Sequence, residues 1–96
     1  MKPCCEEWLR AQFGDDRETI EAVYAEYVET LSDLKGKLAA ARQGGDAAEL
    51  DRVLHTIKGS AAMAGDRELS ALAQSARGTD DPALLDSLLQ QMAVIG

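Results

Sequence analysis

The sequence has few aromatic residues, two prolines, two cysteines and a single histidine. Aromatic residues make up 4% of the 96 residues, whereas hydrophobic residues make up 46%, with alanine and leucine the most frequent. Aliphatic side chains of this kind favour helices, because strands are richer in β-branched and aromatic residues. No segment alternates apolar and polar residues over a useful length. We therefore expect an all-α protein with a single domain over residues 1–96, since the chain is long enough for one hydrophobic core.

Basic residues and long apolar segments are also scarce. The chain has 10 Lys and Arg against 17 Asp and Glu, a formal net charge of −7, which would repel nucleic acid and anionic membranes. No apolar stretch approaches the roughly 20 residues needed to cross a bilayer. The first seven residues lack the apolar centre of a signal peptide. We expect a cytoplasmic protein that binds neither nucleic acid nor membrane.

The shortage of metal ligands argues against a metal centre. Cys4 and Cys5 are adjacent and have no other cysteine to pair with, so we expect two reduced thiols. A structural zinc site needs about four ligands, and the chain offers one histidine in total. Di-iron bundles use Glu-x-x-His pairs, but Arg52 stands three residues before His55. We therefore expect no metal and no cofactor bound to the chain.

Capping patterns and glycines divide the chain into helices. Asp15 and Asp46 are each followed three residues later by glutamate. This is the spacing of a helix N-cap residue and a glutamate whose side chain bonds back to the amide of the cap. Gly44-Gly45 ends the long helix between these caps, and Asp81 followed by Pro82 begins the last helix. The expected helices cover about 6–12, 15–44, 46–64, 69–76 and 82–95.

Apolar residues recur at steps of three and four in each of these segments, which is typical of helices packed along their length. In the long helix they are Ile20, Tyr24, Tyr27, Leu31, Leu34, Leu38 and Ala41. The short glycine-bearing links force neighbouring helices to run antiparallel. The pattern predicts an up-down-up-down four-helix bundle over about 13–95. We expect the short extra N-terminal helix to cover one end of it with Trp8, Leu9 and Phe13.

His55 is the residue on which the chemistry depends. The apolar stripe of its helix is predicted to contain Leu50, Leu54, Ile57, Ala61 and Ala64. At about 100° per residue, His55 lies roughly 140° from the centre of that stripe, so its ring should face solvent. Lys58 falls one turn further on, where its side chain can meet the ring. Gly59 and Ala62 leave almost no side chain beside it.

A functional role for His55 competes with simpler interpretations. A core histidine is disfavoured by its position opposite the apolar stripe, and an incidental surface histidine remains open. Hydrolytic catalysis would need a nucleophile and an orienting acid, which the sequence does not group. Gly59 inside a helix costs about 1 kcal/mol relative to alanine, which favours close approach by another backbone. A neutral imidazole attacks phosphoryl groups, and the Lys58 ammonium would offset their charge.

The run Leu54-His55-Thr56-Ile57-Lys58-Gly59-Ser60-Ala61-Ala62, followed by Gly65 and Leu69, resembles the signature of histidine-containing phosphotransfer (HPt) domains. The resemblance covers about residues 13–92. Two departures stand out. Ile57 replaces the leucine common before the lysine, and segment 71–78 is about one helical turn shorter than is usual in the family.

The resemblance implies a four-helix bundle that relays phosphoryl groups between receiver-domain aspartates in multistep two-component signalling. His55 would carry the phosphoryl group, Lys58 would help hold its oxygens, and Gly59 would let the receiver approach. Arg52 and Ala62, which flank the ring, are further candidates for docking. The implied partners are response-regulator receiver domains and a hybrid sensor histidine kinase, and Mg²⁺ would belong to the receiver. The chain would be a phosphoryl carrier without autonomous catalytic activity.

Two alternatives remain open. A helical adaptor or regulator would bind a kinase or receiver through the same face without chemistry at His55, and a metal-binding bundle is a more distant possibility. We expect a monomer. The alternative is a dimer. Because the second hairpin is short, Leu69, Leu72 or Leu84 could be exposed at the end of the bundle and be covered by a second copy.

Overall fold

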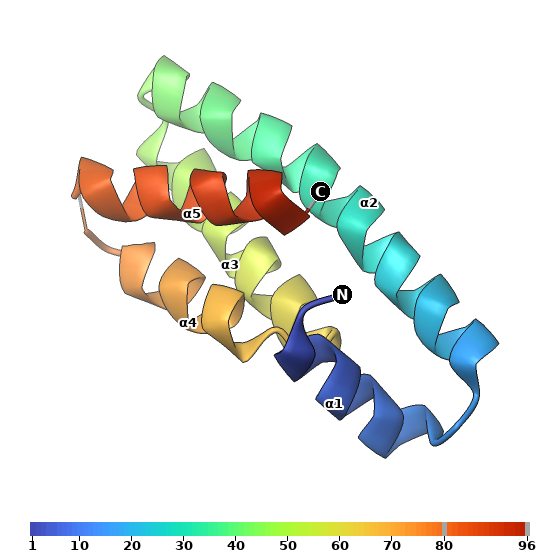
Figure 1. Cartoon of the computed structure of the whole chain (residues 1–96). Helices are drawn as coiled ribbons and strands as arrows, with labels where there is room; N and C mark the ends of the chain where they lie inside the picture. The colour runs from blue at the N-terminus through green and yellow to red at the C-terminus, as the bar shows by residue number, and fades with distance from the viewer. Residues whose placement is uncertain (80, 96) are drawn as a thin grey trace.

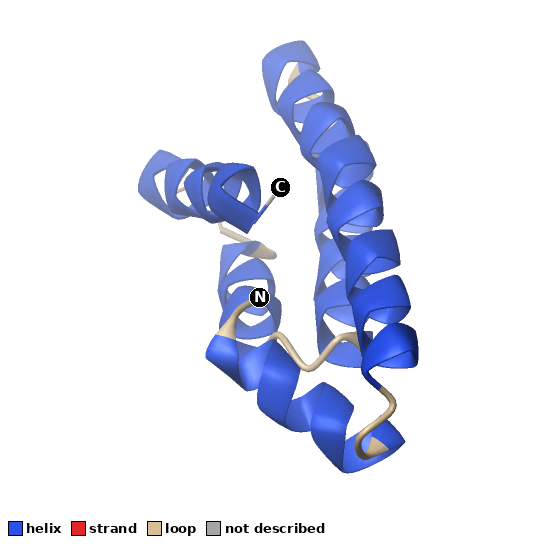
Figure 2. Cartoon of the chain, turned by 45° about the vertical axis from the view of Figure 1, so that its right-hand side comes forward, coloured by secondary structure: helices blue, strands red, loops and turns tan. Residues whose placement is uncertain are grey.

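The computed structural model describes residues 1–79 and 81–95, and in this part of the chain all regular structure is helical (Figure 2). The helices are α1 (Pro3–Phe13), α2 (Arg17–Gly44), α3 (Ala47–Met63), α4 (Arg67–Ala76) and α5 (Pro82–Ile95). The all-α prediction is confirmed. The predicted N-terminal helix began too late, because Pro3 occupies the first turn, where its missing amide costs no hydrogen bond.

Helices α2 to α5 form the bundle that the sequence predicts (Figure 1). Each helix packs against the next, and α5 returns to pack against α2. Helix α2 has 28 residues and so reaches about 42 Å at 1.5 Å per residue, which matches the longest dimension of the molecule, 44 Å. The second hairpin is short, with 10 residues in α4 and 14 in α5. Helix α1 lies across the end of the bundle where α3 joins α4.

Aspartates begin the bundle helices. Asp46 accepts a hydrogen bond from the Glu49 amide at 3.1 Å, and Asp81 accepts one from the Ala83 amide at 3.0 Å, as predicted. The prediction of Asp15 as the cap of α2 was wrong by one residue. Asp16 is the cap, because the amide and the hydroxyl of Thr19 both donate to its carboxylate. Two hydrogen bonds from one residue outweigh the glutamate spacing that had favoured Asp15.

The predicted apolar stripes form the core with two corrections. All of the predicted seam of α2 is buried except Tyr24, which is half-buried. In α3, Val53 is buried and Leu50 only half-buried, so the stripe is shifted toward Val53. Leu69 is fully buried and therefore offers no surface for the alternative dimer. Leu72 and Leu84 are half-buried and pack against the core.

Helix α1 contributes one expected residue and two unexpected ones to the core. Leu9, which was expected, is fully buried, and Cys5 is fully buried and Cys4 buried because the helix begins early enough to place them against the bundle. Trp8 and Phe13 keep more than a third of their surface exposed. Trp8 lies against Gly65, where an added Cβ would come within 2.3 Å of the Trp8 Cβ. Gly65 also has a φ of +74°, so this close approach requires glycine.

None of the helices in the described ranges is both long enough and apolar enough to cross a membrane.

Candidate functional site

His55 lies on the exposed face of α3, as the helical spacing predicts. Its neighbours Leu54 and Ile57 point into the core and are at most 1% exposed. They fix the rotation of α3, since turning the helix to bury the imidazole would expose both aliphatic side chains to water. The ring is therefore available to a second protein.

The His55 ring contacts a charged pair that joins α3 to the end of α4. Arg77 Nη1 lies 3.0 Å from His55 Nδ1. The same guanidinium donates from Nε to Asp51 Oδ1 at 3.1 Å and from Nη2 to Asp51 Oδ2 at 3.3 Å. Because an arginine has only donors, the Nδ1 atom must be the acceptor. Asp51, Arg77 and His55 thus form one connected group.

The hairpin of α3 and α4 brings this group together. Asp51 precedes His55 by one helical turn, so both side chains lie on the same face of α3. Arg77 follows the last residue of α4 and leaves the helix in an extended conformation, with φ −70° and ψ 135°. The hydrogen bond from Arg77 lowers the pKa of the Asp51 carboxyl and raises that of the guanidinium. Both partners therefore stay ionised near neutral pH.

Lys58 and Ala62 line a groove of about 590 Å³ between α1, α3 and α4. Trp8 and Gln74 supply parts of its other walls. The Lys58 backbone carbonyl accepts a hydrogen bond from the Ser70 hydroxyl at 3.2 Å, which ties this turn of α3 to α4. Within residues 1–79 and 81–95, the Lys58 ammonium makes no ion pair. It can therefore offer its charge to an arriving anion.

The remaining predicted docking residues lie in open positions on α3. A Cβ added at Gly59 would have no neighbour within 4 Å, so the surface there is bare. The Arg52 side chain is 76% exposed and pairs with Glu49 one turn earlier. The structure therefore groups Lys58 and Ala62 in one groove and holds the Arg52 guanidinium at Glu49.

Comparison with known families agrees with this geometry. Residues 22–95, which include all but the first turn of α2 and continue to the end of α5, match the family model of the Hpt domain. The chain belongs to the Hpt domain family. No curated protein and no solved structure matches it. The family assignment implies phosphotransfer within phosphorelays, and Hpt domains generally interact with receiver domains and kinases. Helix α1 lies outside the matched residues of this Hpt domain.

Three residues of the Hpt site were missed in the sequence. Asp51 could have been found, because it stands four residues before His55 and helical neighbours at that spacing meet. Arg77 could not, since its contact depends on the register between α3 and α4. Trp8 was expected to cover the bundle end, but it also lines the groove beside Lys58.

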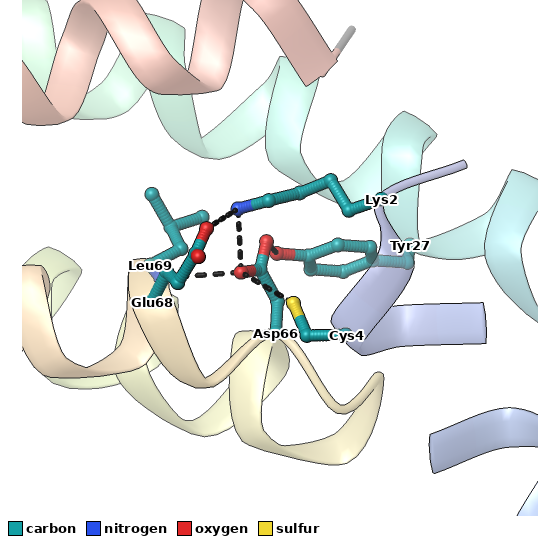
Figure 3. Close-up of polar contacts among 6 residues, drawn as sticks. All are labelled: Lys2, Cys4, Tyr27, Asp66, Glu68 and Leu69. Carbon is teal, nitrogen blue, oxygen red and sulfur yellow. Dashed lines mark hydrogen bonds and ion pairs between the residues drawn. The ribbon is translucent and has the colours of Figure 1, made fainter. Parts of the chain in front are cut away.

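A second polar cluster lies in the interior of the Hpt domain, beside the turn between α3 and α4 (Figure 3). Asp66 is fully buried and accepts hydrogen bonds from Lys2 Nζ at 2.7 Å and from the Tyr27 hydroxyl at 2.7 Å. It also caps α4 through the Leu69 amide at 3.2 Å. Lys2 bonds to Glu68 as well, at 3.4 Å. This cluster joins α1, α2 and α4.

The Cys4 and Cys5 thiols lie beside Asp66, with their sulfur atoms and a carboxylate oxygen all within 4.8 Å of one another. Both cysteines are free. Burial, followed by the charge of Asp66, raises the pKa of the Cys5 thiol to about 12. Asp66 already accepts from Lys2, Tyr27 and Leu69, so the Lys2 ammonium balances its charge without a metal ion. The geometry therefore fits a buried structural cluster.

Proposed function

We propose that this Hpt domain carries a phosphoryl group on His55 as an intermediate between receiver-domain aspartates of a multistep phosphorelay. The observation that carries the proposal is the exposed imidazole on α3, in a chain of the Hpt family. It lies one turn from a bare glycine and from a lysine that has no ion pair among the described residues. In this proposal the protein is a phosphoryl carrier, and its partners are response-regulator receivers and a hybrid sensor histidine kinase.

The transfer step needs one nitrogen lone pair. A neutral His55 ring attacks the phosphorus of a receiver aspartyl phosphate, so that an N–P bond forms and the P–O bond to the aspartate breaks. The electron pair of the broken bond returns to the receiver's carboxylate. Lys58 offsets the negative charge that gathers on the three equatorial oxygens. Mg²⁺ belongs to the receiver in this scheme, and the reaction requires no cofactor bound to the Hpt chain.

The docking face follows from the same geometry. Gly59 and the groove lined by Lys58 and Ala62 lie beside the ring and give a receiver a surface with few side chains to displace. Arg52 lies at the edge of this face and supplies a positive charge. The monomer is the acting species in this proposal, since the receiver needs only the α3 face.

The experiment incubates the full chain with receiver domains of its host, each carrying a radiolabelled aspartyl phosphate. We expect acid-labile, alkali-stable label on the native chain and none on His55→Gln. Lys58→Ala should accept the label more slowly and keep its melting temperature, because Lys58 is only half-buried and its ammonium forms no ion pair with the described residues. Receiver binding without label on the native chain would overturn the proposal and support the adaptor function.

A further inference from the structure

We propose that Arg77 and Asp51 together determine which ring nitrogen of His55 carries the proton. In the free protein they keep the proton on Nε2 and cover the Nδ1 lone pair, so that neither ring nitrogen can accept a phosphoryl group. The inference rests on the proposed function of His55 for its consequence, whereas the tautomer itself can be measured without any phosphoryl transfer.

The Arg77 guanidinium covers Nδ1 of the His55 ring. The Arg77 guanidinium can only donate, and its Nη1 lies 3.0 Å from Nδ1, so the Nδ1 lone pair faces an N–H group. A neutral imidazole has one protonated and one unprotonated nitrogen. The proton of the neutral ring must therefore lie on Nε2. In this state Nδ1 is covered by the guanidinium and Nε2 has no lone pair to offer.

Asp51 is the group that can hold a proton on Nδ1 once Arg77 has moved. Its carboxylate lies one turn before His55 and is now occupied by both Arg77 Nε and Nη2. If the guanidinium moves away, Asp51 becomes the nearby acceptor for a proton on Nδ1. That hydrogen bond stabilises the opposite tautomer, in which Nε2 carries the lone pair. Even without Arg77, the ordinary pKa of an aspartate carboxyl, about 4, keeps the Asp51 carboxylate ionised at neutral pH and able to accept.

The contact between Arg77 and Asp51 can open. The Arg77 side chain is 28% exposed and Asp51 is 51% exposed. Both side chains have access to water, so a docking partner with charged groups of its own can compete for the guanidinium. Arg77 also lies outside α4 and before Gly78, which has a φ of +73°, and its amide bonds to the Gln74 carbonyl, so its side chain can turn while the helix stays intact. Arg77 and Asp51 are thus positioning residues.

The tautomer can be read directly, because His55 is the only histidine. We would record the ¹⁵N chemical shifts of both ring nitrogens in the full chain at rising pH until they stop changing, so that the neutral ring is observed. The native chain should show an unprotonated Nδ1 and a protonated Nε2. Arg77→Ala should move the proton toward Nδ1, and Asp51→Ala combined with Arg77→Ala should reverse that movement, because alanine offers no acceptor.

Arg52→Ala is the matched control, because Arg52 lies on the same helix but pairs with Glu49. It should leave both ring shifts unchanged. A protonated Nδ1 in the native chain, or ring shifts in Arg77→Ala that equal those of the native chain, would overturn the proposal.

A kinetic measurement tests the consequence. We would follow labelling of His55 by phosphoramidate, a small donor that needs no docking surface. Arg77→Ala should be labelled several-fold faster than the native chain, and the double variant should lose the gain. Equal or slower labelling of Arg77→Ala would overturn the claim that Arg77 restrains transfer. If no form is labelled by phosphoramidate or a receiver, the proposed function fails, and the ring shifts still decide the tautomer assignment.

Discussion

Two carboxylates of this Hpt domain each hold a cation, and they differ in burial. Asp66 is fully buried and bonds to Lys2, which is 20% exposed, at the end of the bundle that α1 covers (Figure 3). Asp51 is half-exposed and bonds to Arg77 beside His55. Similar chemical groups therefore form a fixed junction at one site and a contact open to competition at the other. Solvent access thus separates a fixed ion pair from one that a partner can compete for.

The energetic difference follows from desolvation. Burial lowers the pKa of Lys2, but the hydrogen bond and charge of Asp66, with those of Glu68, outweigh it and raise the pKa above its usual value. Burial and the hydrogen bond to Asp66 also raise the pKa of Tyr27. Removing Asp66 would leave these groups in a poorly solvated place without their acceptor. Removing Asp51 would return Arg77 to water.

The largest predicted effect is that of Asp66→Ala on stability. We expect the free energy of unfolding to fall by about 3–5 kcal/mol, because Lys2, Tyr27 and the Leu69 amide all lose a buried, charged acceptor. Asp51→Ala is the matched control on the surface and should cost much less, because its partner Arg77 returns to water. Urea denaturation of both variants measures the difference. Equal losses from the two variants would show that burial does not separate the two pairs.

The second prediction uses the pH dependence of the buried cluster. Folding raises the pKa of the Cys5 thiol from 9.0 to about 12, so the unfolded chain releases this proton first. Stability due to Cys5 is therefore complete below about pH 9 and is lost as the pH rises toward 12. The slope reaches at most about 1.4 kcal/mol per pH unit for one proton. Urea denaturation between pH 8 and 11 measures it.

Cys5→Ala is the control for this prediction. It removes the thiol but keeps a small apolar side chain at the start of α1, so the decline in stability above pH 9 should become shallower. The Arg77 and Asp51 pair does not titrate in this range, because Arg77 holds the pKa of Asp51 low and its own is raised. A native chain whose free energy of unfolding stays constant up to pH 11 would contradict the assignment.

The bundle was predictable because its signals are local. Spacings of three and four identified the buried seam of α2, and the Asp46 and Asp81 caps were read from their neighbours. The error at Asp15 arose because Asp16 can accept from both the amide and the hydroxyl of Thr19. Spacing alone does not weigh that second hydrogen bond.

The contacts between distant segments were not predictable from one sequence. The exposed position of His55 followed from the helical angle, but its bond to Arg77 depends on where α4 ends beside α3. Asp66 was missed for the same reason, because its sequence position indicates only a helix cap and its other contacts come from distant segments. Its burial follows from α1, which brings Lys2 and Cys4 over it. A turn has no periodic sequence pattern, so nothing in the sequence indicated that α1 would bury Asp66.

The smallest predicted effect on stability is that of Gly59→Leu, on the exposed face of α3 that carries His55 and Asp51. The Cβ position at Gly59 is open, and glycine costs a helix about 1 kcal/mol, so the variant should be as stable as the native chain or more stable by up to about that amount. Receiver binding should nevertheless weaken, because the new side chain projects from the face beside His55. Thermal unfolding and titration with an unphosphorylated receiver separate the two effects. Unchanged affinity would mean that the receiver approaches His55 from elsewhere, because a leucine at a contacted position must be displaced or accommodated.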